Sequence, residues 1–354
     1  MNEKERIYSI LLRNPGISTA KLVKLGEFSQ RTYISRLLSA LIKEQRVHRE
    51  KQGRNVIYFV SDKVIGLEEN LKLKGLHEDE IWGKLRKTTT FLNDISEQAE
   101  NILYFAFTEM LNNAIDHSHS GVGYVKIWLE DDKLKFIVKD NGIGVFKNVM
   151  AKKHLSSETE AIQEIIKGKL TTAARRHSGE GIFWTSKIAD QFILKSYEYE
   201  LAINNSIEDY TIKKLKKLLV GTEVHFEIDK NTNKSIRKLF RDYTFDTEHL
   251  TLDTTIIPIN LYNEGDIWIS RSQAKKVLAG LEKYKKIIFN FAGVEVIGQA
   301  FADEIFRVFN IEHPDIILEP INMSDSVKLM VSHAQNDRTG REQFTRETKK
   351  RTLD

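Results

Sequence analysis

The chain has 354 residues, of which 41% are hydrophobic and 29% are charged, a balance typical of a soluble globular protein with two or three domains. It contains no cysteine, so disulfide bonds and thiolate metal sites are excluded, and the net charge of +4 is modest. No apolar run approaches the length of a membrane span, and we therefore expect a cytoplasmic protein that does not bind a membrane.

Residues 1–63 show a pattern of helices followed by a hairpin, and this region is basic. Its first 60 residues hold twelve lysines and arginines against five acidic residues. The predicted elements are helices over residues 4–14, 18–25 (capped by Ser18 and ended by Gly26) and 29–42 (capped by Ser29), then strands over residues 46–50 and 55–60 around the turn Lys51-Gln52-Gly53-Arg54.

This arrangement resembles the winged helix-turn-helix of transcription factors. The resemblance implies that residues 29–36 enter a DNA major groove, while the turn holds phosphate. The candidate DNA-binding residues are Gln30, Arg31, Tyr33 and Arg36 on the third helix, with Lys51 and Arg54 in the turn. The local positive charge favours DNA as the partner, and a winged helix that contacts protein is the alternative.

Residues 64–96 are predicted to connect this region to the next. The stretch 64–80 is mixed in charge and weakly periodic, which indicates a linker or a connecting helix. A helical pattern follows over residues 81–96. His77, the only candidate for the phosphoacceptor of a histidine kinase, lies in an acidic segment interrupted by glycine, so that function ranks low.

The run from Thr108 to His117 predicts a helix with one polar stripe. Glu109, Asn113 and His117 are spaced i, i+4, i+8 and therefore project from the same side, where carboxylate and amide oxygens suit a hard cation such as Mg²⁺. The apolar residues that would seat this helix against a sheet are Ile102, Phe105, Ala106, Met110 and Ala114. A solvated or capped helix face is the alternative.

Two glycine-rich turns follow. A hairpin over residues 124–130 and 133–139, turned at Asp131-Asp132, leads into Asp140-Asn141-Gly142-Ile143-Gly144, and Ser178-Gly179-Glu180-Gly181 comes later. Closely spaced glycines let backbone N–H groups approach an anion, and an aspartate that ends a strand can accept from an exocyclic amine. These turns predict an adenine pocket beside a phosphate cradle.

These motifs resemble those of the GHKL or Bergerat ATPases, which include gyrase-type topoisomerases, chaperone ATPases and histidine and serine kinases. The resemblance implies ATP and Mg²⁺ as cofactors, Glu109 as the catalytic residue that orients or deprotonates the attacking group, and Asn113 as the metal ligand. It also implies that Asp140 reads the adenine amino group, supported by Thr222. The nucleotide-binding residues are Asn112, Asn113, Asp140, Gly142, Gly144, Ser178, Gly179, Gly181 and Thr222.

The interval between the glycine turns corresponds to the family's ATP lid, residues 146–177. The lid cations that could meet the triphosphate are Lys167, Lys169, Arg175 and Arg176, although a solvated helix surface is the alternative for each. A helix after Gly181 would aim its N-terminus at the phosphates. Strands over residues 191–197 and 222–228, with a lysine-rich helix-like insert at 212–219, would complete the sheet.

Past residue 255 strands and helices alternate, which predicts a small α/β domain. The predicted elements are strands at 287–291 and 316–318 and helices at 299–309 and 324–331, with Ser324 and Ser326 as helix caps. This region resembles the STAS-like domains, relatives of anti-sigma-factor antagonists. The stretch 297–301 matches the antagonists' phosphorylation site but has no hydroxyl, so phosphorylation there is excluded.

The sequence thus predicts an α+β multidomain protein. Its parts are a winged helix (1–63), a connecting helical segment (64–96), a GHKL ATP-binding domain with helices on a mixed sheet (97–232), a STAS-like α/β domain (250–334) and a flexible polar tail (335–354). The first hypothesis is that Mg-ATP binding, with slow hydrolysis, gates binding of DNA by the winged helix or of a protein by the STAS-like domain. The alternatives are an anti-sigma-type serine kinase that acts on a separate protein and an ATP-driven dimeric clamp on DNA; we also consider a homodimer.

Overall fold

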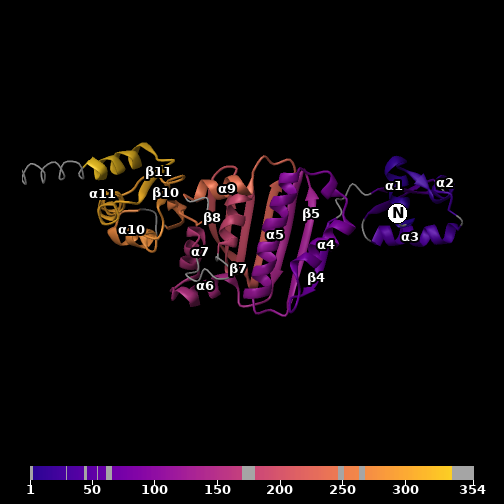
Figure 1. Ribbon diagram of the computed structural model, residues 1–354, viewed down its shortest axis with the longest axis horizontal. Helices are drawn as coiled ribbons and strands as arrows, with labels where there is room; N and C mark the ends of the chain where they lie inside the picture. Colours follow the sequence, from indigo (N-terminus) through magenta and orange to yellow (C-terminus); the bar gives the residue numbers. More distant parts are fainter. Residues whose placement is uncertain are drawn as a thin grey trace, which may run out of the picture.

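The computed structural model describes residues 3–28, 30–43, 46–53, 55–60, 66–169, 180–245, 251–262 and 268–336. Figure 1 shows three parts that follow one another along the long axis of the molecule in the order of the sequence. Each part contains its own sheet. The protein is therefore the α+β multidomain chain that the sequence predicts.

The N-terminal part holds the helices and the hairpin expected there. Its elements are α1 (Glu3–Arg13), β1 (Ile17–Ser18), α2 (Thr19–Leu25), α3 (Arg31–Lys43), β2 (Val47–Gln52) and β3 (Asn55–Val60). The strands form an antiparallel sheet in the order β1-β3-β2. Ser18 caps α2 as predicted, because its hydroxyl accepts from the backbone N–H of Lys21 at 3.4 Å. The predicted cap Ser29 and the candidate DNA-binding residue Arg54 lie outside the described residues.

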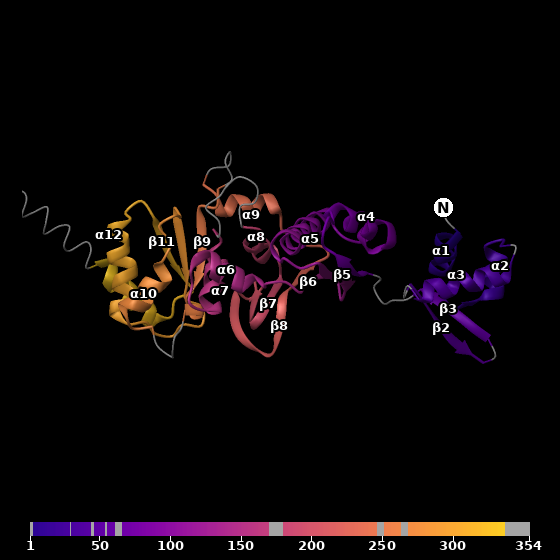
Figure 2. The same ribbon diagram turned by 90° about the horizontal axis from the view of Figure 1, so that it is seen from below.

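The central part is a sheet covered on one face by helices (Figure 2). Its elements are β4 (Leu67–Lys72), α4 (Glu78–Thr88), α5 (Glu97–His117), β5 (Val122–Glu130), β6 (Lys133–Asp140), α6 (Val145–Lys153), α7 (Glu158–Lys167), α8 (Gly181–Ile188), β7 (Gln191–Asn204), β8 (Asp209–Asp229) and α9 (Ile236–Tyr243), with a 3₁₀ turn at Phe91–Asn93 after α4. The five strands lie in the order β4-β5-β6-β8-β7.

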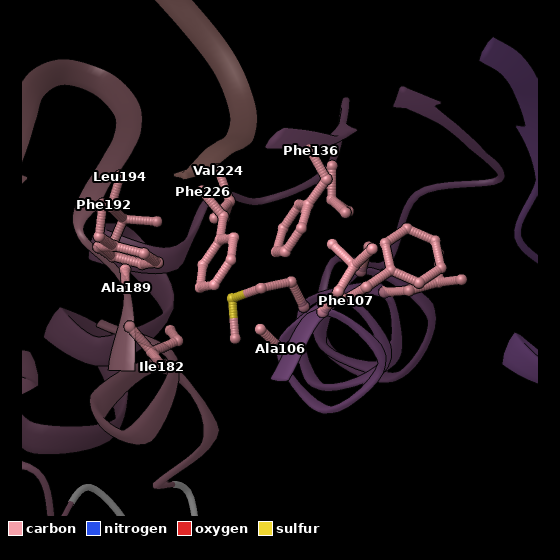
Figure 3. Close-up of a cluster of buried hydrophobic side chains, with 14 of the residues drawn as sticks. Ala106, Phe107, Phe136, Ile182, Ala189, Phe192, Leu194, Val224 and Phe226 are labelled. Atoms are coloured by element: carbon pink, nitrogen blue, oxygen red, sulfur yellow. The ribbon is translucent and has the colours of Figure 1, made fainter. Parts of the chain in front are cut away.

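Helix α5 is seated on this sheet by four of the five apolar residues that the sequence predicts, Ile102, Ala106, Met110 and Ala114, together with Phe107, which was not predicted. Ala106 and Phe107 of α5 meet Phe136 of β6 and Phe226 of β8 (Figure 3). The rings of Phe136 and Phe226 stack with centroids 4.8 Å apart. Burial of such large side chains, about 1.5–3 kcal/mol each, holds the helix against the strands. Phe105 differs from the prediction, since it packs against Phe240 of α9 with centroids 6.1 Å apart.

Three sequence predictions about the central part are wrong. Residues 67–72, expected in a linker or helix, form the edge strand β4, which pairs with β5 and buries Leu67 and Leu71. Residues 212–219, expected as a helix-like insert, belong to β8, because the long strand β7 offers them backbone partners. Finally, the sheet is entirely antiparallel rather than mixed.

The C-terminal part is a small parallel α/β structure, as predicted. Its elements are β9 (Thr254–Pro258), a 3₁₀ turn (Ile259–Tyr262), α10 (Arg271–Leu278), β10 (Lys286–Asn290), α11 (Gln299–Asp303), a π-helical turn (Glu304–Phe309), α12 (Asn310–Glu312), β11 (Ile317–Ile321) and a helix over residues 325–336. The strand order is β11-β10-β9. Ser324 caps the last helix by accepting from Val327 at 3.2 Å, whereas Ser326 lies inside that helix and is not a cap.

The face of the central sheet opposite the helices carries paired charges. Glu223 on β8 lies within 3.4 Å of Lys139 and 3.1 Å of Lys195 on the two neighbouring strands. Its carboxylate is also 2.7 Å from His225 Nε2. The hydrogen bond with His225, followed by the bond and charge of Lys195, lowers the pKa of Glu223 to about 2.

Glu223 is expected to stabilise the fold above its ordinary pKa of 4.5 and to lose that effect as the pH falls from 4.5 to 2, because its folded pKa is the lower one. We predict that Glu223→Gln lowers the free energy of unfolding at pH 7 by about 1–3 kcal/mol. Urea unfolding at several pH values measures this difference. The exposed Glu97→Gln on α5 serves as the control, and a difference that persists undiminished at pH 2 would contradict the prediction.

Candidate functional site

A cavity of about 340 Å³ lies between α5, the sheet and the starts of α6 and α8. Its lining residues are Glu109, Met110, Asn112, Asn113, Ala114, Asp116, His117, Ser118, Val138, Asp140, Gly144, Val145, Asn148, Val149, Lys152, Lys153, Gly181, Ile182, Leu194, Thr222 and Val224. The volume and the mixture of apolar walls with a few polar groups are typical of a small-molecule site. The cavity thus brings together elements that are more than 100 residues apart in sequence.

The polar stripe of α5 forms one wall of this cavity. Glu109, Asn113 and His117 all line it, and so does Asn112. His117 is at the exposed end of the helix, whereas the side-chain nitrogen of Asn113 is buried and has no hydrogen-bond partner among the described residues. A buried amide without a partner is costly, so this side chain is suited to meet a bound group.

Asp140 lies at the opposite wall, where β6 ends. It is only 4% exposed, and its Oδ1 accepts from the backbone N–H of Gly142 at 2.8 Å. Burial raises the pKa of Asp140, while hydrogen bonds with Gly142 and Thr222 oppose that shift. The carboxylate sits beside the apolar side chains of Val138 and Val224. An acceptor placed this way suits the amino group of a flat, apolar base.

The hydroxyl of Thr222 holds two parts of the site together. It interacts with Asp140 and also accepts from the backbone N–H of Val145, at 2.9 Å, where α6 begins. Gly142 itself does not line the cavity and acts through its bond to Asp140. Gly144 lines the cavity at the N-terminal end of α6.

Helix α8 begins against the carboxylate of Glu109. A Cβ atom at Gly181 would lie 2.2 Å from Glu109 Oε2, so only glycine leaves the carboxylate where it is. The N-terminus of α8 faces the cavity through Gly181 and Ile182, where its backbone N–H groups favour an anion. The other predicted members of this glycine turn, Ser178 and Gly179, lie outside the described residues.

The cations that line the cavity differ from those predicted. Lys152 and Lys153, at the end of α6, are in the wall. Lys167 instead is 2% exposed and donates to Glu164 and to the backbone of Ala279 in the C-terminal part. Lys169 likewise donates to the backbone of Lys283, and the predicted Arg175 and Arg176 lie outside the described residues.

Sequence reasoning missed Asn148, Lys152 and Lys153. Their spacing, i, i+4 and i+5, shows that one face of the helix carries them, but it does not show that this face meets the cavity. Among the residues that the structure describes, no three His, Asp or Glu side chains gather as a metal site.

The cavity thus combines an acid and an amide of one helix with a buried aspartate at the end of a strand. Residues 98–232 match the family described as histidine kinase-, DNA gyrase B- and HSP90-like ATPase. Residues 273–328 match the family described as STAS-like domain of unknown function (DUF4325). The chain therefore carries an ATP-binding GHKL ATPase domain followed by a STAS-like domain.

Comparison with curated proteins found no match for this chain. Within the described part of the chain, no helix combines the length and the apolar character that a membrane crossing requires.

We predict that Lys152→Ala and Lys153→Ala each weaken ATP binding about 3- to 10-fold, because each removes a cation from the cavity wall. Adenosine, which lacks phosphates, should bind the variants and the native protein equally. Isothermal titration calorimetry measures both affinities. The control is Lys147→Ala on the same helix, whose ammonium lies over the ring of Tyr197 and does not line the cavity. Equal loss of ATP and adenosine binding would contradict the phosphate assignment.

Proposed function

We propose that the protein is an ATP-binding regulator in which Mg-ATP, hydrolysed slowly, gates the binding of DNA or of a protein partner. The observation that carries the nucleotide part is the convergence of Glu109, Asn113 and Asp140 on one cavity within the domain that matches the GHKL family. Asp140 would accept a hydrogen bond from the adenine amino group, and the valine and leucine side chains around it would cover the base.

The phosphate end would lie toward α8 and the lysines of α6. Asn113 would hold Mg²⁺ through its amide oxygen, together with phosphate oxygens. Its buried amide nitrogen, which has no hydrogen-bond partner among the described residues, would be free to donate to a phosphate oxygen. Bound there, the metal ion would neutralise phosphate charge. Glu109 would orient the attacking water and accept its proton, and the absence of a side chain at Gly181 leaves room for the carboxylate beside the N-terminus of α8.

Asn113→Ala is expected to reduce Mg-ATP affinity at least tenfold, since it removes the proposed metal ligand, while affinity measured in EDTA should change little. Asn101→Ala, an exposed asparagine on the same helix, is the matched control and should bind normally. Calorimetry with and without Mg²⁺ gives two ATP affinities for each protein. A native protein that binds ATP equally with and without the metal would remove the metal role of Asn113.

We also propose that the N-terminal part is a winged helix that binds DNA. Gln30, Arg31 and Arg36 are exposed at α3, and Lys51 is exposed at the end of β2, so these side chains are accessible to a nucleic acid. Tyr33 is less suited to base contact, because a hydrogen bond with Glu3 engages its hydroxyl and raises its pKa.

Arg31→Ala and Arg36→Ala are each predicted to weaken DNA binding about 5- to 100-fold. Where the lost contact is to phosphate, the slope of log affinity against log salt concentration should also become shallower by about one. The control is Arg46→Lys, because Arg46 is buried over the ring of Tyr8 and keeps its charge in the variant. Fluorescence anisotropy over a range of salt concentrations measures these quantities. If DNA affinity is identical without nucleotide and with a non-hydrolysable ATP analogue, the proposed gating is wrong.

The proposed protein partner would meet the STAS-like domain beside α11. Ile269 and Val296 are 56% and 50% exposed there, and Trp268 and Ile297 pair across a bridge that brings these neighbours together. Exposed apolar side chains next to each other favour a protein contact.

A further inference from the structure

The end of helix α7 is docked on the STAS-like domain, and Figure 2 shows α7 beside β9. The backbone carbonyl of Lys167, the last residue of α7, accepts from the hydroxyl of Tyr284 at 2.5 Å and from that of Thr255 at 2.9 Å. The same Tyr284 hydroxyl accepts from the backbone N–H of Lys169 at 3.0 Å. One phenol therefore ties both sides of Gly168 to the STAS-like domain.

Lysine side chains reinforce this contact in both directions. Lys169 donates to the carbonyl of Lys283 at 3.0 Å, and Lys283 donates to the carbonyl of Lys169 at 2.9 Å. Both ammonium groups lie over the ring of Tyr284, at 5.0 and 5.4 Å from its centroid. Burial lowers the pKa of Lys169, and it lowers that of Lys283 to about 8. These lysines are therefore held in the interface rather than displayed to solvent.

The backbone at this junction has no spare room. Gly168 has a φ of +107°, and a Cβ there would lie 2.6 Å from Leu252 and 2.9 Å from Phe183. A larger residue would force these neighbours apart. Helix α7 therefore cannot shift relative to the STAS-like domain without disturbing the contacts around Gly168.

Helix α8 connects the nucleotide cavity directly to the hydrophobic core of the STAS-like domain. Gly181 and Ile182 line the nucleotide cavity, whereas the next two residues, Phe183 and Trp184, belong to the hydrophobic core that continues into the STAS-like domain. Phe183 and Trp184 pack edge-on against Tyr243, with ring centroids 5.3 and 5.9 Å apart. Four consecutive residues of one short helix thus contact both the nucleotide site and the neighbouring core.

We propose that Tyr284 is a positioning residue through which nucleotide in the GHKL domain and the conformation of the STAS-like domain are thermodynamically coupled. The proposal rests on the nucleotide binding proposed above. If nucleotide favours one arrangement of α7 and α8, the bonds from Tyr284 transmit that preference to β9 and β10, and by linkage the state of the STAS-like domain alters nucleotide affinity by the same factor.

The test compares hydrogen–deuterium exchange of the full chain with and without a non-hydrolysable ATP analogue and Mg²⁺. In the native protein, the analogue is expected to slow exchange at least threefold in residues 254–258 and 281–290. Tyr284→Phe keeps the ring and removes the hydroxyl. In this variant the factor by which the analogue slows exchange should be at least threefold smaller than in the native protein, while nucleotide affinity stays within about threefold of the native value. Thr255→Val, which removes the second hydroxyl, should give a smaller reduction.

The matched control is Tyr262→Phe. Tyr262 is buried in the same domain, and its hydroxyl has no hydrogen-bond partner among the described residues, so this variant should retain the full response. The coupling is wrong if the native protein binds the analogue without any change in the two segments, or if Tyr284→Phe responds like the native protein. Failure of the proposed function is a separate result, since calorimetry would then detect no nucleotide binding to the native chain.

Discussion

The seating of helix α5 on the antiparallel sheet is the constraint on which the site depends. Ala106, Phe107 and Met110 are buried against β6 and β8, and this fixes the rotation of the helix about its axis. Because side chains four residues apart share a helix face, Glu109 and Asn113 must then point to the same hollow. The sheet places Asp140 across that hollow, so the packing of apolar groups sets the distance between polar groups that are remote in sequence.

The chemistry of the cavity follows from what surrounds each polar group. Asp140 is buried and receives hydrogen bonds from a backbone amide and from Thr222, an environment that keeps the carboxylate in place as an acceptor. Glu109 is instead placed at the positive end of α8, where a carboxylate is stabilised by the helix dipole. The two acids thus line one cavity in different surroundings, and under the proposed function Asp140 would recognise the base while Glu109 would act near phosphate.

Local patterns in the sequence predicted the fold where they were strong and unambiguous. Three such patterns were predicted correctly, because their periodicity is visible within a short stretch of sequence. They are the polar stripe on α5, the hairpin at Asp131-Asp132 and the alternation of strands and helices in the C-terminal part. Strand β4 was missed because Leu67 and Leu71 are spaced as they would be on a helix, and only pairing with β5 makes them a strand. The orientation of Lys167 also escaped prediction, since its partner Ala279 is 112 residues away. Side-chain direction at a domain boundary is decided by tertiary contacts that sequence spacing does not encode.

The border between the two C-terminal domains in the sequence is not a border in the packed interior. Phe183 and Trp184 come from within the GHKL match, yet they share a cluster with Tyr243, Leu252 and the strands of the STAS-like domain. Cutting the chain between the matched regions would leave these large rings facing water, which invites self-association of the fragment. The GHKL and STAS-like domains should consequently be expressed and purified together as one folding unit, even though each is recognisable in the sequence by itself.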